Sequence, residues 1–128
     1  MVCDEQHPGA GPWVQQAYRR AGYTTLRFDF RGVGASEGRY ADGKGEVDDV
    51  LSAVSHLGKT GVAEIELAGY SFGAWVNAHA ATSTTAIRGM MMVSPPVAFM
   101  DFTGVGILES LRHVVTGSAD DIAPAAAI

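Results

Sequence analysis

Apolar residues recur along the chain in two alternating patterns, one with the period of a helix and one typical of a buried strand. Residues 12–21 and 46–57 place apolar side chains every three or four positions, as amphipathic helices do. Residues 72–81, directly after an apolar run, also have the composition of a helix. Four short apolar or β-branched runs predict strands at 24–30, 65–70, 89–94 and 113–117. Strands that alternate with helices predict a parallel sheet covered on both faces.

The two ends of the chain fit this alternation less well. The residues before His7 are too few for a full strand, so no strand is expected there, and residues 125–128 are expected to begin a helix. No internal repeat and no linker divides the 128 residues, which are enough for one hydrophobic core but not for two. We therefore expect residues 1–128 to form a single domain.

The charge and composition narrow the classes of function. Nine basic and fourteen acidic residues give a net charge of −5 without a basic stripe, so no nucleic-acid partner is expected. No apolar run approaches the roughly 20 residues of a membrane span, so no membrane partner is expected either. Cys3 is the single cysteine and the first residues lack a signal-peptide pattern, which predicts a cytoplasmic location. No His and Cys residues have metal-ligand spacing, so we expect no metal and no other cofactor.

The segment GYSFG, residues 69–73, has the G-x-S-x-G pattern of a nucleophile elbow. An apolar strand runs straight into Ser71 and a helical segment follows at once, in the strand–turn–helix order that an elbow requires. Gly69 and Gly73 would avoid crowding in the tight turn, and a serine at a helix amino terminus is well placed to stabilise an oxyanion. The alternative is an ordinary glycine-rich turn in which Ser71 only caps the helix.

Three further loops are expected at the same edge of the sheet, because the carboxyl ends of parallel strands lie together. They are residues 31–38, 94–97 and 117–121. The last contains Asp120 and Asp121, and an acid later in the chain than the serine suits a triad in the order Ser…Asp…His. The alternative for this pair is a solvated turn.

The glycine-rich segment 31–38 follows a predicted strand, as a dinucleotide-binding loop does. Its glycines at 32, 34 and 38 miss the G-x-G-x-x-G spacing, and the next helix begins too late to meet a pyrophosphate. A nucleotide-binding domain is therefore the weakest hypothesis. We expect Asp29 and Arg31 to form a local pair with a structural role.

Several blocks together resemble the α/β-hydrolase superfamily, and more closely its small bacterial serine hydrolases. The blocks are HPGAG at 7–11, LRFDFRGVGASEG at 26–38, LAGYSFGAW at 67–75, VSPPV at 93–97 and GSADDIAP at 117–124. The resemblance implies a three-layer α/β-hydrolase core with a parallel sheet. The family has further strands before the first block and after the last. The chain is therefore expected to be a partial domain, with about four to five strands.

The same resemblance implies roles for three residues after strands. Ser71 matches the nucleophile of the family. Asp120 matches the acid of its triad, and Asp121 is the less favoured neighbour. The backbone N–H of Phe72, directly after the serine, matches one donor of the oxyanion hole.

The second oxyanion donor would come from the loop after His7. Pro8 has no N–H, so the resemblance leaves Gly9 or Ala10 as the donor. The loop between HPG and the helix at Trp13 is shorter than is usual in the family.

The histidine of the triad is the missing part. In the family it lies beyond one further strand after the acid loop, so we expect it to be absent from this chain. His113 and His79 are expected about 13 Å and 12 Å from the active edge, and His56 lies on the amphipathic helix. Only His7 lies on the correct edge, at a position that is structural in the family.

The resemblance thus implies a serine hydrolase acting on an ester- or thioester-like small acyl substrate of unknown identity. The alternative is a non-catalytic hydrolase core that serves as an interaction module or is an incomplete fragment. Open sheet edges would then favour pairing with another chain, including a second copy in a homo-oligomer.

Overall fold

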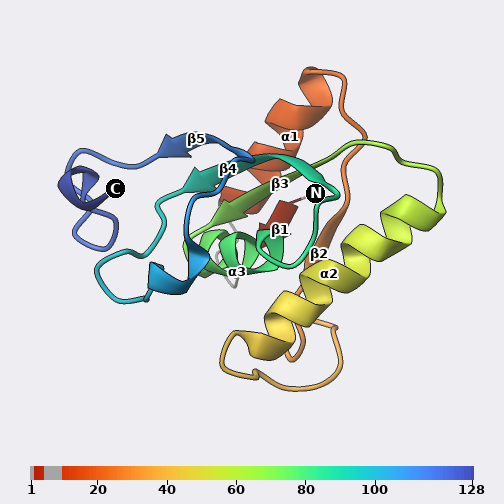
Figure 1. The fold of residues 1–128 in the computed structure, drawn as a ribbon, viewed down its shortest axis with the longest axis horizontal. Helices are drawn as coiled ribbons and strands as arrows, with labels where there is room; N and C mark the ends of the chain where they lie inside the picture. Colours follow the sequence, from red (N-terminus) through yellow and green to blue (C-terminus); the bar gives the residue numbers. More distant parts are fainter. Residues whose placement is uncertain (1, 5–9) are drawn as a thin grey trace.

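The core of the fold is one sheet of five parallel strands in the order β2-β1-β3-β4-β5 (Figure 1). The computed structural model describes residues 2–4 and 10–128 of the chain. All the strands point the same way, so their carboxyl ends gather at one edge of the molecule (Figure 1). The predicted α/β architecture with a parallel sheet is confirmed, and so is the expected number of strands.

The first strand, β1 (Val2–Asp4), lies within the sheet and corrects the expectation of no strand before His7. It pairs with β2 on one side and with β3 on the other. A strand of three residues is too short to be recognised from its sequence pattern. Parallel neighbours on both sides supply hydrogen bonds that compensate for its short length.

The other strands follow the predicted runs with shifted boundaries. They are β2 (Arg27–Asp29), β3 (Ile65–Tyr70), β4 (Ile87–Val93) and β5 (Leu111–Val115). The prediction for β3 is confirmed at both ends, whereas β4 and β5 each begin two residues earlier than expected. His113 consequently lies in the middle of β5, opposite Met91, and not at its beginning as expected.

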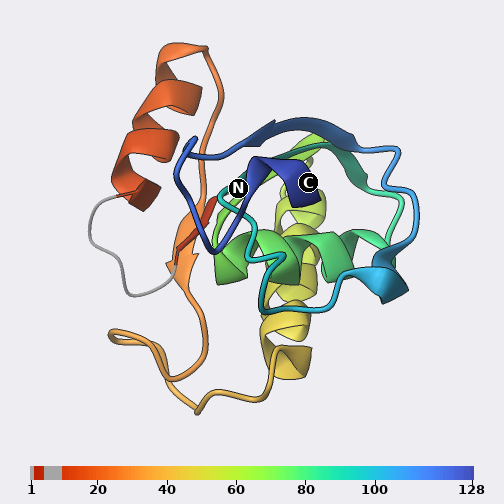
Figure 2. The same ribbon diagram turned by 90° about the vertical axis from the view of Figure 1, so that its left-hand side faces the viewer.

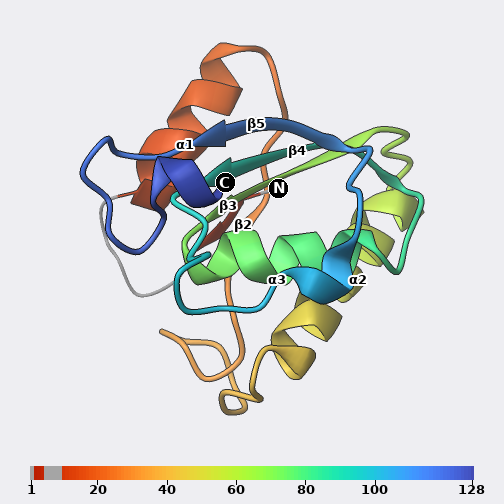
Figure 3. The ribbon, with the colours of Figure 1, turned by 60° about the vertical axis from the view of Figure 1, so that its left-hand side comes forward.

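The helices cover both faces of the sheet, which gives three layers (Figures 1 and 3). α1 (Ala10–Arg20) packs on one face, against β1 and β3. α2 (Lys44–Lys59) and α3 (Phe72–Ala81) lie on the other face, where α3 contacts the sheet and α2 packs beside α3. The predicted helices are confirmed. No helix in the described part of the chain is long and apolar enough to cross a membrane.

The hydrophobic core lies between the sheet and α3. Leu67 of β3 and Met90 of β4 are buried, and Val76 of α3 is fully enclosed. The other buried positions of α3 include alanines and a glycine, and such small side chains let the helix axis approach the sheet closely. The turn that leads from β3 into α3 is therefore held by packing on both sides.

Two short 3-10 helices occupy the carboxyl-terminal third of the chain, η1 (Thr103–Val105) and η2 (Ala125–Ala127). The expectation that residues 125–128 begin a helix is met by a single 3-10 turn. Figure 2 views the molecule from the side to which the strands point, with η2 and the loop after β5 in front.

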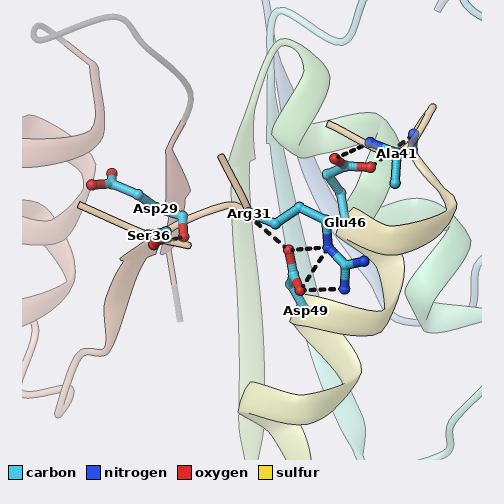
Figure 4. A network of polar contacts seen from close by, with 7 residues as sticks. Asp29, Arg31, Ser36, Ala41, Glu46 and Asp49 are labelled. Atoms are coloured by element: carbon cyan, nitrogen blue, oxygen red, sulfur yellow. Dashed lines mark hydrogen bonds and ion pairs between the residues drawn. The ribbon is translucent and has the colours of Figure 1, made fainter. Parts of the chain in front are cut away.

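The loop after β2 is joined to α2 by a network of polar contacts (Figure 4). Arg31 forms a bidentate ion pair with Asp49, whose closest N–O distance is 2.7 Å. The expected pair between Asp29 and Arg31 is therefore wrong, and Figure 4 shows the Asp29 carboxylate pointing away from Arg31. Asp49 lies on α2, 18 residues from Arg31 in the sequence. The sequence prediction considered only the nearby Asp29 as a partner and therefore missed Asp49.

Candidate active site

Ser71 occupies a strained turn between the last residue of β3 and the first residue of α3. Its backbone has φ 50° and ψ −120°, a conformation that non-glycine residues adopt rarely and that clusters at functional sites. The Ser71 N–H donates to the Val93 carbonyl of β4 at 2.9 Å, and its carbonyl accepts from the Ala74 N–H at 2.9 Å. The turn is thus fixed by the neighbouring strand and by the helix.

The hydroxyl of Ser71 is not used to cap α3. Ser71 occupies the N-cap position, but no capping hydrogen bond from its side chain is present in the described structure. A serine that only capped the helix would accept a bond from an N–H group of the first turn. This geometry favours the elbow over the capping alternative.

Gly69 is required by the close approach of β3 and α3. A Cβ atom at this position would lie 2.5 Å from the Gly73 carbonyl oxygen and 2.6 Å from the Ala74 nitrogen. Both neighbours are backbone atoms of the helix and cannot rotate away. The first glycine of the G-x-S-x-G pattern therefore has the steric role that the sequence predicts.

Phe72 is the first residue of α3. The N–H groups of a first helical turn have no partner within the helix, so the Phe72 N–H is of the type that can hold an oxyanion. The Phe72 ring is buried, stacks on Trp75 and packs against Phe30, which anchors the start of the helix. Of the expected second donors, Ala10 begins α1 and Gly9 lies outside the described residues.

Asp120 lies in the loop after β5 and is held by several hydrogen bonds. Its Oδ1 accepts from the backbone N–H groups of Ala123 at 2.9 Å and of Ile122 at 3.0 Å. The bond from Ala123, and after it the nearby Ser94 hydroxyl, contribute most to lowering the pKa of the Asp120 carboxyl below its usual range. These contacts keep a carboxylate at this position ionised.

The structure separates the two acids that the sequence left as neighbours. Asp121 is exposed, and the described residues offer it none of the hydrogen bonds that hold Asp120. A solvated turn thus describes Asp121, whereas Asp120 is the ordered carboxylate of the loop.

The order of strands brings the serine turn and the acid loop to one edge. β4 lies between β3 and β5, and the register aligns Tyr70 with Val93 and Val93 with Val115. The residue that directly follows β3, β4 and β5 is Ser71, Ser94 and Thr116, respectively. These three residues with hydroxyl groups therefore form a row along the carboxyl edge of the sheet.

Ser94 is the member of this row that sequence reasoning missed. It has φ 46°, and its backbone N–H donates to the Val115 carbonyl of β5 at 2.7 Å. The sequence offers a weak signal, because Ser94 ends a predicted strand and precedes two prolines. Neither its backbone conformation nor its partner could be predicted from that signal.

None of the three described histidines lies in a loop at this edge. His56 is in the last turn of α2, and His113 is exposed in the middle of β5. His79 lies near the carboxyl end of α3, and its ring centroid is 4.1 Å from that of Trp75. Its buried Nε2 has no hydrogen-bond partner among the described residues. His7, the remaining histidine, lies outside the described residues.

Metal ligands do not cluster near the elbow. In the part of the chain that the structure describes, no three His, Cys, Asp or Glu side chains lie close enough together to hold a metal ion. The hydroxyls, the backbone N–H groups and the Asp120 carboxylate at this edge are the kinds of group that nucleophilic acyl transfer uses.

The chain is similar to one curated protein in sequence and to several solved structures in fold. No protein-family model matches the sequence. An uncharacterized protein from Rickettsia prowazekii is 35% identical over 109 residues, which cover 81% of this chain and 46% of that protein.

Three solved structures of bacterial proteins are similar over 98% of the chain. A candidate α/β hydrolase of unknown function from Agrobacterium tumefaciens is 28% identical with a TM-score of 0.87. An α/β serine hydrolase homologue from Coxiella burnetii is 32% identical with a TM-score of 0.85. An α/β serine hydrolase from Xanthomonas campestris, described as having no lid, is 31% identical with a TM-score of 0.82.

The chain spans 62%, 64% and 61% of the length of these three structures, respectively. The likeness therefore concerns the part of the fold that carries the serine turn and the acid loop. The sequence motifs, the parallel sheet with its elbow and these neighbours together place the chain in the α/β-hydrolase superfamily.

Proposed function

We propose that the protein is a serine hydrolase in which Ser71 is the nucleophile toward an ester- or thioester-like acyl substrate. The observation that carries the proposal is the strained backbone of Ser71, with φ 50° and ψ −120° and a hydroxyl that does not cap α3. Strain of this kind persists where the surrounding structure enforces it, and here β4 and α3 both bond to the turn.

In the proposed reaction, the Ser71 oxygen bonds to the substrate carbonyl carbon while a base accepts the hydroxyl proton. The carbonyl oxygen becomes an oxyanion held by the Phe72 N–H and by a second N–H from Gly9 or Ala10. The leaving alcohol or thiol takes the proton from the base and departs, which leaves an acyl-enzyme. Water then releases the acid by the same steps.

Asp120 would orient and stabilise the base, which we propose is a histidine outside these 128 residues. The positions of His56, His79 and His113 support this assignment, because none follows the carboxyl end of a strand. His7 is the residue of this chain to test as an alternative base.

The proposed substrates are small acyl esters reached through an open site. The connection between β4 and β5 contains only η1 as regular structure, so it offers little material for a lid. The likeness to a Xanthomonas protein described as having no lid supports the same view. A cytoplasmic location is part of the proposal, in keeping with a single cysteine.

The test is reaction of the 128-residue chain with a fluorophosphonate probe across a pH series. Because the proposed base lies outside these residues, we expect labelling that is slow at neutral pH and faster at alkaline pH, where the hydroxyl depends less on a base. This labelling should be lost in Ser71→Ala and retained in the control Ser83→Ala, since Ser83 is an exposed serine just beyond α3. A labelling rate that rises with an apparent pKa near 6.5 would identify a histidine base, which His7→Ala then tests. A folded chain that is not labelled at any pH contradicts the proposal that this chain holds a reactive serine.

A second candidate function is an interaction module that binds through the edges of its sheet. Among the described residues, β2 and β5 each pair with one strand only, so both present backbone groups at an edge. Val115 on β5 is 52% exposed, which adds an apolar side chain to that edge. Edges of this kind favour pairing with another chain, including a second copy.

A further inference from the structure

We propose that Arg88 and Arg112 form a binding site for an organic phosphate at the amino edge of the sheet. Each arginine is the second residue of its strand, Arg88 in β4 and Arg112 in β5. Arg88 precedes Ser94 by six residues along β4, about 20 Å at 3.3 Å per residue of strand. The site is therefore separate from the proposed active site and does not rest on the proposed function.

Both arginines are extra residues in the pairing of the sheet. The residues on either side of Arg88 pair with successive residues of β3, so Arg88 itself has no partner in that strand. The residues on either side of Arg112 pair in the same way with β4, so Arg112 has no partner there. Such bulges are rare between parallel strands, and they re-aim the side chain of the extra residue. The sheet thus departs from regular pairing twice at the same end, each time at an arginine.

The two arginine side chains line one open cavity of about 570 Å³, a volume within the range of small-molecule sites. Nη2 of Arg112 donates to the carbonyl oxygen of Arg88 at 3.1 Å, so the Arg112 guanidinium lies against the backbone of the neighbouring strand. Arg31 pairs with Asp49, but among the described residues no ion pair joins Arg88 or Arg112 to a carboxylate. Two like charges in one cavity without a counterion favour the binding of an anion.

The rest of the lining indicates the chemistry of the ligand. Thr85 and Ser110 add hydroxyl groups, which can donate to phosphate oxygens. Ile107 and Leu108 line the same cavity, and Ile107 is 95% exposed. A phosphate monoester fits both parts of the lining. Its charge of nearly −2 matches two guanidiniums, which bind phosphate oxygens bidentately, and the organic group that it carries would cover the apolar side chains.

Phenyl phosphate is the probe, added to the wild-type chain at constant ionic strength and about pH 8, where the phosphate carries two charges. Amide shifts measured by NMR give both the Kd and the place of binding. We expect saturable shifts at residues 84–88 and 107–112. Inorganic phosphate should bind more weakly because it leaves the apolar lining exposed, and benzoate should bind more weakly because it carries one charge.

Charge variants test the two arginines. Arg88→Gln and Arg112→Gln each remove one guanidinium and should raise the Kd for phenyl phosphate at least about tenfold. Arg39→Gln is the matched control, because Arg39 is an exposed arginine in the loop after β2 and its loss changes the net charge equally. Glu109 is the one carboxylate that lines the cavity, so Glu109→Gln should lower the Kd.

A wild-type chain without saturable shifts at these residues overturns the inference. So does a Kd that is unchanged in Arg88→Gln or raised equally in Arg39→Gln. Arg112→Gln also loses the bond to the Arg88 carbonyl, so Arg88→Gln decides the question if the Arg112 variant fails to fold. Benzoate that binds as tightly as phenyl phosphate overturns the choice of a phosphate.

The titration does not depend on whether Ser71 reacts. Failure of the wild-type chain to react with a fluorophosphonate would therefore count against the proposed function alone.

Discussion

Three residues of the described structure combine a side chain with a positive φ: Asp42, Ser71 and Ser94. Ser71 and Ser94 are the first residues after two adjacent strands, β3 and β4, at the carboxyl edge of the sheet. Their local strain is offset by hydrogen bonds to the neighbouring strands. The candidate site therefore contains two residues with unfavourable backbone conformations that hydrogen bonds within the sheet maintain. Backbone strain of this kind is common at functional positions.

The strain at Ser71 predicts a difference between two substitutions that both remove the Ser71 hydroxyl. Ser71→Ala keeps a Cβ at φ 50°, whereas Ser71→Gly can adopt that conformation freely. We expect the glycine variant to be more stable than the alanine variant by roughly 1 kcal/mol. Urea unfolding followed by tryptophan fluorescence measures the difference. Equal stability would mean that the turn is not strained.

At the scale of elements, the start of α2 is organised by a buried acid. Glu46 is 1% exposed and accepts the N–H groups of Ala41 and Gly43, each at 2.9 Å. Gly43 has φ 82° at the N-cap, and a Cβ there would overlap the Trp75 ring of α3. Glu46 therefore connects the loop after β2 to the start of α2, which packs beside α3. The N-cap residue is a glycine, so no N-cap side chain contributes.

Replacement of Glu46 tests this organisation. Glu46→Ala removes two hydrogen bonds to a charged acceptor and leaves the buried Gly43 N–H without its partner. We expect a loss of about 2–4 kcal/mol in the free energy of unfolding. Asp48→Ala is the matched control, because Asp48 is an exposed acid on the same helix and should change stability by less than about 0.5 kcal/mol. Similar losses in both variants would refute the role of Glu46.

At the scale of the whole molecule, the sheet ends in two edge strands. One of them, β5, carries Val115, which is 52% exposed. A lysine on an edge strand discourages pairing with another chain. We therefore expect the edge at β5 to be the place where one copy of the chain pairs with another.

Sedimentation velocity over a range of concentrations measures this property. We expect the wild-type chain to associate as its concentration rises, and Val115→Lys to shift it toward the monomer. Val62→Lys is the control, because Val62 is also an exposed valine but lies in the connection between α2 and β3, away from the edges. A wild-type chain that stays monomeric throughout would argue against association through β5.

Much of the fold could be predicted because its signals are local. Apolar periodicity marks α2, an apolar run marks β3, and the G-x-S-x-G spacing marks the turn between β3 and α3. The steric need for Gly69 could also be predicted, because an elbow brings a helix directly against its own strand. Each of these features depends on residues that are neighbours in the sequence.

The sequence by itself therefore determined the α/β alternation, the serine turn and the presence of an acid in the loop after β5. Only the tertiary structure decided that three residues suffice for β1, that Arg31 pairs with Asp49, and that Asp120 rather than Asp121 is the ordered acid. It also placed Ser94, at the end of β4, between Ser71 and the loop that holds Asp120. The physical reason is common to these cases: each depends on hydrogen bonds between segments distant in sequence or on the folded shape of a loop, whereas propensity and periodicity describe only the local chain.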